Sequence, residues 1–313
     1  MVEIKNVAVF GASGNFGKPI TTALLSAGFS VTVFTRPESS SVLPAGVRDI
    51  IRADYADVSA LTEKLQGQDA VVNVTGPGAI GSASAMVEAA YHAGVKRFII
   101  NDFGWGINEK SLPEFKAIGG TRKVTWDLAV KYAEEDRKNG KEDGFTWTGI
   151  TIGNPIDWAL KKFPRMGFNL TTRRATIYDA GTEAFTGTTL EGIGQSVVGV
   201  LSHPAETANR FVKARSIKVS QNALLDAFSQ ATPSGMGQEW EVERSTTAEL
   251  LLEGRRKHAA GEGGWILDLL VYQLFAPGEA RCVVAPSREE SDAPLLEIRE
   301  ESANEVAAKA LAA

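Results

Sequence analysis

The chain has 313 residues, of which 43% are hydrophobic and 23% charged; these values are ordinary for globular proteins and argue against disorder. A formal net charge of −5 argues against nucleic-acid binding, and no apolar run approaches the roughly 20 residues that span a membrane. The single cysteine, Cys282, excludes an internal disulfide, and three scattered histidines show no metal-ligand spacing, so we expect no metal.

Residues 1–3 lead directly into an apolar stretch, which leaves no room for a secretory signal. We therefore expect a cytoplasmic protein. Because neither nucleic acid nor membrane is indicated, the expected partner is a small molecule.

Residues 4–17 predict the strand, turn and helix that bind a dinucleotide. A short apolar run meets glycines spaced G-x-x-G-x-x-G, and apolar residues then recur at helical spacing from 20 to 27. Without side chains at Gly11 and Gly14, a pyrophosphate can approach the N–H groups at the positive end of the helix, and Gly17 lets that helix approach the strand. The expected cofactor-binding residues of this turn are Gly11, Ser13, Gly14, Asn15, Phe16 and Gly17.

Residues 30–35 predict a second strand, rich in β-branched side chains, which ends at Arg36. In a dinucleotide fold the adenosine ribose lies at this strand end, where an acidic side chain would accept hydrogen bonds from a free 2′-hydroxyl. A guanidinium instead pairs with a 2′-phosphate, so Arg36 favours NADPH over NADH. The alternative is a solvated surface arginine.

Strands and helices continue to alternate up to residue 152. We expect strands at 47–51, 69–74, 95–100 and 145–152, the last closing the sheet, and helices at 59–65 (capped by Ser59), 84–93 and 122–138, with a loop at 105–121. This alternation predicts a Rossmann-type, doubly wound parallel sheet of the α/β class, with ligands beyond the carboxyl ends of the strands. Thr75, Gly76 and Phe103 follow such ends and are expected to contact the cofactor.

After residue 153 the regular alternation stops. Helices are expected at 190–201, 222–230 (capped by Ser220), 248–260 and 265–275, and strands at 210–213 and 240–242. We predict an NADP(H)-binding domain at 1–153 and a smaller C-terminal α+β substrate lobe at 154–313, part of which returns to the first domain. Asn154, at the junction, is a further candidate for cofactor binding.

Together these features resemble the NmrA-like, isoflavone-reductase-like family of atypical short-chain dehydrogenases, and its fungal branch in particular. The motifs that carry the resemblance are NVAVFGASGNFG (6–17), TR (35–36), LQGQDAVV (65–72), AGVKRFI (93–99), DFG (102–104), DW (157–158) and the run 188–198. The resemblance implies a two-lobe fold, NADPH in the first lobe and a small, often aromatic substrate between the lobes.

The chain departs from this family at the catalytic position. The resemblance places Thr121 where the reductases carry a lysine that acts as general acid or base, and a threonine hydroxyl donates a hydrogen bond but does not shuttle protons. Lys116 or Lys123 could replace it, although each reads more simply as a solvated lysine. No tyrosine is followed four residues later by a lysine, so the Tyr-x-x-x-Lys pair is also missing.

The catalytic candidates are therefore Thr121, Lys123 and Asp157, and three functions stay open. The first is an NADPH-dependent reductase of a hydrophobic, aromatic small molecule of specialised metabolism. The second is a cyclase or isomerase that keeps the fold without transferring a hydride. The third is an NmrA-like regulator that senses the dinucleotide and reports to a protein partner.

Overall fold

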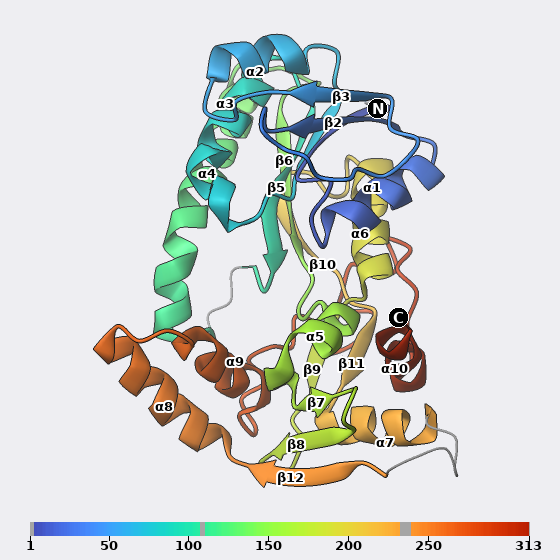
Figure 1. The fold of residues 1–313 in the computed structure, drawn as a ribbon. Helices are drawn as coiled ribbons and strands as arrows, with labels where there is room; N and C mark the ends of the chain where they lie inside the picture. Colours follow the sequence, from blue (N-terminus) through green and yellow to red (C-terminus); the bar gives the residue numbers. More distant parts are fainter. Residues whose placement is uncertain (1–2, 107–109, 232–238, 313) are drawn as a thin grey trace.

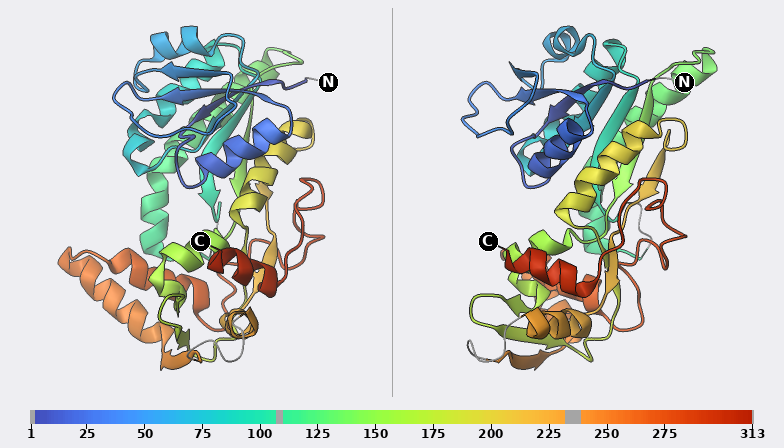
Figure 2. Two further views of the ribbon diagram at one scale, coloured as in Figure 1. Left: turned by 45° about the vertical axis from the view of Figure 1, so that its right-hand side comes forward. Right: turned by 90° about the vertical axis from the view of Figure 1, so that its right-hand side faces the viewer.

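The computed structural model describes residues 3–106, 110–231 and 239–312, apart from the side chains of Pro77, Ala117, Ile118 and Thr121. Two lobes follow one another along the long axis of the molecule (Figures 1 and 2). The larger lobe holds a parallel sheet between two layers of helices, and the smaller holds short strands surrounded by helices.

The sheet of the larger lobe has seven parallel strands in the order β10-β6-β5-β4-β1-β2-β3. Their bounds are β1 (Asn6–Phe10), β2 (Ser30–Thr35), β3 (Asp49–Arg52), β4 (Ala70–Asn73), β5 (Arg97–Gly104), β6 (Thr146–Thr151) and β10 (Arg210–Lys213). The order reverses between β1 and β4, and in doubly wound sheets the ligand crevice opens at such a reversal. The predicted fold class is confirmed.

Helices cover both faces of this sheet (Figure 1). On one face lie α2 (Val58–Leu65), α3 (Ala83–His92) and α4 (Pro113–Lys138), and on the other lie α1 (Gly17–Ser26) and α6 (Leu190–Ser202). A short 3₁₀ helix, η1 (Pro77–Ser82), follows β4. Since β10 and α6 come from the second half of the chain, that half completes the larger lobe.

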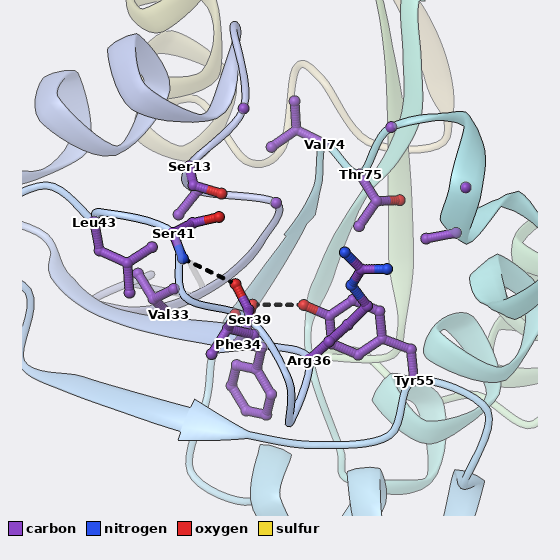
Figure 3. Close-up of a pocket in the computed structure, with 17 residues that line it drawn as sticks. Ser13, Val33, Phe34, Arg36, Ser39, Ser41, Leu43, Tyr55, Val74 and Thr75 are labelled. Atoms are coloured by element: carbon purple, nitrogen blue, oxygen red, sulfur yellow. Dashed lines mark hydrogen bonds between the residues drawn. The ribbon is translucent and has the colours of Figure 1, made fainter.

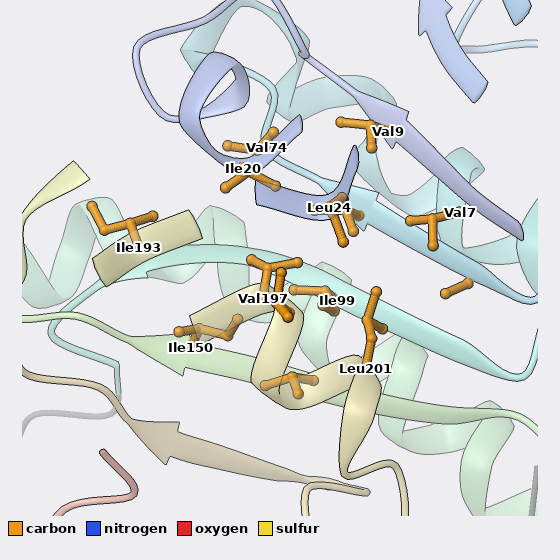
Figure 4. Close-up of a cluster of buried hydrophobic side chains, with 14 of the residues drawn as sticks. Val7, Val9, Ile20, Leu24, Val74, Ile99, Ile150, Ile193, Val197 and Leu201 are labelled. Atoms are coloured by element: carbon orange, nitrogen blue, oxygen red, sulfur yellow. The ribbon is translucent and has the colours of Figure 1, made fainter. Parts of the chain in front are cut away.

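Alternation along β1 fixes which side chains reach which helix layer. Val7 and Val9 face α1 and α6 and belong to the same buried cluster as Leu24 and Val197 (Figure 4), while Phe10 faces the opposite layer. The Phe10 ring stacks on Phe34 of β2 with centroids 4.7 Å apart. Each of these side chains is almost completely buried, which stabilises the fold by about 1.5–3 kcal/mol per large apolar side chain.

Three expectations about the larger lobe are wrong. Helix α4 begins at Pro113, well before Arg122, because proline suits the first helical turn and the helix continues through Gly119 and Gly120. Asp57, rather than Ser59, caps α2: its carboxylate accepts a 2.9 Å hydrogen bond from the N–H of Ala60.

The sixth strand also does not close the sheet, because β10 pairs with the outer edge of β6. The strand at 210–213 was expected, but its partner was not.

The smaller lobe contains more elements than the sequence pattern predicted. Besides the expected α7 (Gln221–Ala231), β12 (Glu241–Ser245), α8 (Thr247–Ala260) and α9 (Trp265–Phe275), it has α5 (Ile156–Lys162), η2 (Pro164–Met166), β7 (Phe168–Asn169), β8 (Arg174–Tyr178), β9 (Phe185–Gly187), β11 (Ile217–Val219) and α10 (Ala303–Leu311). β7 and β12 flank β8, and β9 pairs with β11. A separate hydrophobic core fills this lobe. The predicted boundary at residue 153 stays a prediction.

Candidate functional site

The turn between β1 and α1 is shaped by two glycines that pack against backbone. Gly11 has a φ of +90°, and a Cβ there would lie 2.6 Å from the carbonyl oxygen of Val74. A Cβ on Gly17 would collide with the carbonyl oxygen of Gly11. These two positions therefore require glycine so that the turn lies close to both β4 and the start of α1.

The N-terminus of α1 is suited to an anion. Phe16 precedes the helix and offers no side-chain cap, and the first turn contains no acidic residue. The positive end of the helix dipole therefore has no compensating charge from its own first turn. A glycine cradle at such a helix end fits the pyrophosphate of a dinucleotide.

A cleft of about 240 Å³ opens beside this turn (Figure 3). It is walled by segments 11–14, 33–36 and 74–76, which follow or end β1, β2 and β4. We call it the dinucleotide cleft. It lies where the strand order reverses, as expected for a ligand site in this fold.

Arg36 lines the dinucleotide cleft at the end of β2. Its side chain is 60% exposed and its Nε lies 3.3 Å from a carboxylate oxygen of Glu38. Figure 3 shows it beside the Tyr55 ring, with Ser13 and Ser41 across the cleft. The guanidinium is thus accessible to a ligand, and its ion pair is an exposed one of the kind that contributes little to stability.

Tyr55 forms a fixed wall of the cleft. Its hydroxyl donates a 2.8 Å hydrogen bond to the carbonyl oxygen of Phe34, and burial raises its pKa to about 12. The phenol therefore stays neutral at ordinary pH. The hydrogen bond orients the ring, and the raised pKa makes the phenol a weaker acid than an ordinary tyrosine.

Two asparagines, Asn73 at the end of β4 and Asn101 within β5, support the opposite wall. Asn73 Oδ1 accepts hydrogen bonds from the backbone N–H and the hydroxyl of Thr75, at 3.2 and 2.8 Å, and Asn101 Nδ2 donates to the Thr75 carbonyl oxygen at 2.6 Å. Sequence analysis missed both asparagines, and also Ser39 and Ser41 of the cleft wall. A polar side chain that ends a buried strand is the signal that could have identified Asn73.

Of the predicted cofactor residues, six line the dinucleotide cleft together: Gly11, Ser13, Gly14, Arg36, Thr75 and Gly76. Asn15, Phe16 and Gly17 follow in the chain but do not line the cleft. Phe16 and Gly17 form the start of α1. Phe103 and Asn154 lie farther along the strand ends, toward the smaller lobe.

Aromatic side chains mark that farther region. The Phe16 ring lies 6.3 Å from Phe103 and 6.4 Å from Trp158, centroid to centroid. Asn154 is buried there; its Nδ2 makes a 3.5 Å contact with the sulfur of Met166, and its Oδ1 has no partner among the described residues. This region joins the phosphate-binding turn to α5 of the smaller lobe.

The three catalytic candidates lie on two elements, Thr121 and Lys123 on α4 and Asp157 on α5. Thr121 is in α4, but its side chain is outside the described part of the structure. Lys123 is exposed on α4, with Nζ 2.7 Å from Asp127 Oδ1. Asp157 is nearly buried and accepts hydrogen bonds from the N–H groups of Trp158 and Leu190 at 3.0 and 2.9 Å, while burial raises its pKa. Its carboxylate thus holds the start of α6 against α5.

Asp102 is a buried acid that sequence analysis did not select. It lies at the carboxyl end of β5, 3% exposed, with Oδ1 3.6 Å from Nη1 of Arg122 on α4. Its Oδ2 finds no hydrogen-bond partner within residues 3–106, 110–231 and 239–312. Burial raises its pKa to about 6, which places its titration close to neutral pH.

In the described ranges, no group of three or more His, Cys, Asp or Glu side chains is arranged to hold a metal ion. No helix in the same ranges combines the length and apolar character needed to cross a bilayer.

Comparisons with known proteins agree with this geometry. Residues 11–183 match the NAD(P)H-binding family. The chain is 55% identical over 300 residues to oxidoreductase poxI of Penicillium oxalicum, across 96% of this chain and 92% of the relative. It is 32% identical over 257 residues to oxidoreductase aprR of Aspergillus flavus, across 80% and 82% of the two chains.

Solved structures with low sequence identity share the fold. Leucoanthocyanidin reductase from Vitis vinifera in complex with NADPH superposes with a TM-score of 0.73 at 17% identity, across 98% of this chain and all of the other. AtPrR2 with NADP⁺ and (+)-pinoresinol gives 0.70 at 19% identity, across 99% and 100%. An isoflavone reductase gives 0.69 at 16% identity, across 96% and 98%.

The resemblance inferred from the motifs is thereby confirmed. The chain belongs to the NAD(P)H-binding family, in a group that includes the fungal oxidoreductases poxI and aprR, and it has the fold of the isoflavone-reductase-like enzymes.

Proposed function

We propose that this protein is a cytoplasmic, NADPH-dependent reductase that acts on a hydrophobic, aromatic small molecule of specialised metabolism. The observation that carries the proposal is the position of Arg36, which faces the dinucleotide cleft across from the glycine turn. When bound, the nicotinamide cofactor would supply the hydride, and the protein would supply binding, orientation and a proton.

The choice of NADPH rests on the charges at the end of β2. Arg36 is accessible there, and the Ser39 and Ser41 hydroxyls border the same space. A 2′-phosphate would displace Glu38 from Arg36, exchanging an exposed ion pair for a charge-assisted contact with a dianion. NADH would bring no such charge.

The substrate class rests on the aromatic region beyond the phosphate turn. The Phe16 ring lies beside both Phe103 and Trp158 where the larger lobe meets α5. Aromatic side chains of this kind suit contact with a planar, apolar substrate. A structural relative was solved with the aromatic compound (+)-pinoresinol, which is in keeping with this class.

Proton delivery is proposed for one of Thr121, Lys123 and Asp157. Asp157 is held by two backbone N–H groups and Lys123 by Asp127, so either would have to release these contacts to exchange a proton with substrate. Thr121 would orient a substrate oxygen through its hydroxyl, with a water molecule as the proton source.

The test follows hydride and product together. The purified protein is incubated with NADPH that carries deuterium at the nicotinamide C4 and with a panel of aromatic ketones, enones and imines; we expect NADPH oxidation matched by deuterated product. Product without NADPH consumption would favour the cyclase or isomerase. Cofactor binding without turnover, together with capture of a protein partner, would favour the regulator.

A further inference from the structure

A second cavity, of about 500 Å³, lies between α4 and the outer edge of the large sheet, where β6 and β10 pair. We call it the α4 groove. Its volume is about twice that of the dinucleotide cleft and falls within the range typical of small-molecule sites. In the part of the chain that the structure describes, the two cavities share no lining residue.

Aromatic rings from three elements form the walls of the α4 groove. Trp126 of α4 and Trp147 of β6 both pack edge to face against Phe211 of β10, with centroids 5.0 and 5.5 Å apart and interplanar angles of 69° and 70°. Gly149 allows this arrangement, because a Cβ there would collide with the Phe211 ring. Rings at such steep angles form a corner that a further flat ring can enter.

Two consecutive glycines, Gly119 and Gly120, form part of the α4 side of the groove. Glycine inside a helix destabilises the helix relative to alanine. Neither glycine has a positive φ, and a Cβ added to either would meet no described atom within 4 Å. Packing among the described residues therefore does not require them, whereas an occupant of the groove would use the space they leave.

The charged groups of the groove are largely compensated. Lys123 pairs with Asp127, and Arg210 Nη2 lies 2.7 Å from Asp292 Oδ1. Lys116, which is exposed, is a further basic residue of the lining. Ion pairs beside an apolar wall suit an uncharged ligand that carries hydroxyl or carbonyl groups, because such a ligand gains hydrogen bonds without separating the pairs.

We propose that the α4 groove is a second small-molecule site, which takes a flat, uncharged aromatic compound of about two or three rings. The groove shares no described lining residue with the dinucleotide cleft, so binding there can be measured without turnover; among the described side chains, Lys123 is the one proton-delivery candidate that lines it. The groove lies along α4, whose opposite side buries Thr125 and Ala129 in the larger lobe and brings Arg122 to Asp102.

The binding test uses 1-aminoanthracene, a neutral fluorescent three-ring amine. We expect saturable binding to the wild-type protein, with energy transfer from the tryptophans, and a dissociation constant that changes by less than about twofold when NADPH is present at saturation. Absence of saturable binding overturns the proposal. Competition between probe and NADPH also overturns it, because the probe would then occupy the dinucleotide cleft.

Two variants locate the probe. Gly119→Leu and Gly120→Leu each place a side chain in the groove and replace glycine by a strong helix former, so folding is retained; we expect each to weaken probe binding by about tenfold or more. Gly263→Leu is the matched control, because a Cβ at that glycine also meets open space and the residue lies outside the groove. Unchanged binding in both α4 variants contradicts the proposal.

Sedimentation of the same proteins separates a ligand site from an interface. We expect the oligomeric state to be the same in the wild type and in both α4 variants. If the wild type is a dimer that these variants dissociate, the groove is a contact between copies of the chain and the proposal is wrong.

Discussion

Arg52 Nη1 donates a 2.6 Å hydrogen bond to the carbonyl oxygen of Pro37 and so ties the end of β3 to the loop that follows β2. The same atom reaches the carbonyl oxygens of Ser39 at 3.0 Å and Arg36 at 3.4 Å. Arg52 itself does not line the dinucleotide cleft. The segment that presents Arg36 and Ser39 is therefore held in place by a side chain outside the cleft.

Arg52→Ala should weaken NADPH binding by about threefold to tenfold, because the loop must then be ordered by the ligand. Calorimetric titration with NADPH and NADH measures the effect, and NADH should change less. Arg48→Ala, on the same side of the lobe but outside the loop contacts, is the control. An unchanged affinity for NADPH would show that the loop keeps its shape without Arg52.

Arg36→Ala should weaken NADPH binding by about tenfold to a hundredfold and leave NADH nearly unaffected, since a charge-assisted contact with the phosphate is worth about 1.5–3 kcal/mol. Glu38→Gln should tighten NADPH binding slightly, because it frees Arg36 from its exposed ion pair. Equal losses for the two cofactors in Arg36→Ala would mean that the arginine has a structural role.

Gly14→Val should abolish dinucleotide binding while the protein stays folded. The φ of Gly14 is not positive, and a Cβ there would meet only the carbonyl oxygen of Gly11, at 3.2 Å, so the branched side chain projects into the space of the pyrophosphate. Tryptophan fluorescence reports binding and circular dichroism reports folding. Loss of the native circular dichroism signal would instead assign the glycine to the turn itself.

Asp102 should make the protein less stable as the pH rises from about 4 to about 6. Its pKa is raised from 3.8 to about 6 in the folded state, so the protonated carboxyl stabilises the fold fully below about pH 4, and this contribution is lost as the pH rises past 6. The change amounts to about 3 kcal/mol.

Urea unfolding at several pH values measures how the free energy of unfolding changes with pH. In Asp102→Asn we expect the decrease assigned to Asp102 to be absent. The exposed Asp143, changed to Asn, is the control. Parallel pH profiles for the wild type and Asp102→Asn would contradict the buried position of the carboxyl.

Turnover of the proposed reductase should separate the three proton-delivery candidates. If the register with the reductases is right, Thr121→Val should lower turnover by about tenfold to a hundredfold, while Lys123→Met and Asp157→Asn retain most of it. Asp157→Ala, which removes both contacts with backbone N–H groups, should mainly lower the free energy of unfolding. An inactive but folded Lys123→Met with an active Thr121→Val would show that the lysine delivers the proton.

The sequence predicted those parts of the site whose chemistry is local. Gly11, Gly14 and Arg36 could be assigned because strand, turn and charge follow one another within a few residues. The pair of Asp102 and Arg122 could not, because it depends on how α4 lies over β5. Likewise β8 pairs with β12, which lies about 65 residues later in the chain. Strands this short contain too few residues to show a clear alternation of apolar and polar side chains, so the sequence alone does not predict them.

The start of α4 was missed for a different reason. Gly119 and Gly120 indicate a loop rather than a helix, because glycine has a low helix propensity. In the structure the helix passes through both, because packing of the rest of α4 on the sheet outweighs the local preference.

The pairing of β10 with β6 also bears on biosynthesis. While a nascent chain is shorter than 210 residues, the outer edge of β6 has no neighbour, and the face of α1 that α6 covers is bare until residue 202 has emerged. The dinucleotide-binding lobe can therefore finish folding only after two thirds of the chain has been translated. Up to that point the ribosome carries a sheet with an exposed edge, which is the stage at which chaperones would protect this protein from aggregation.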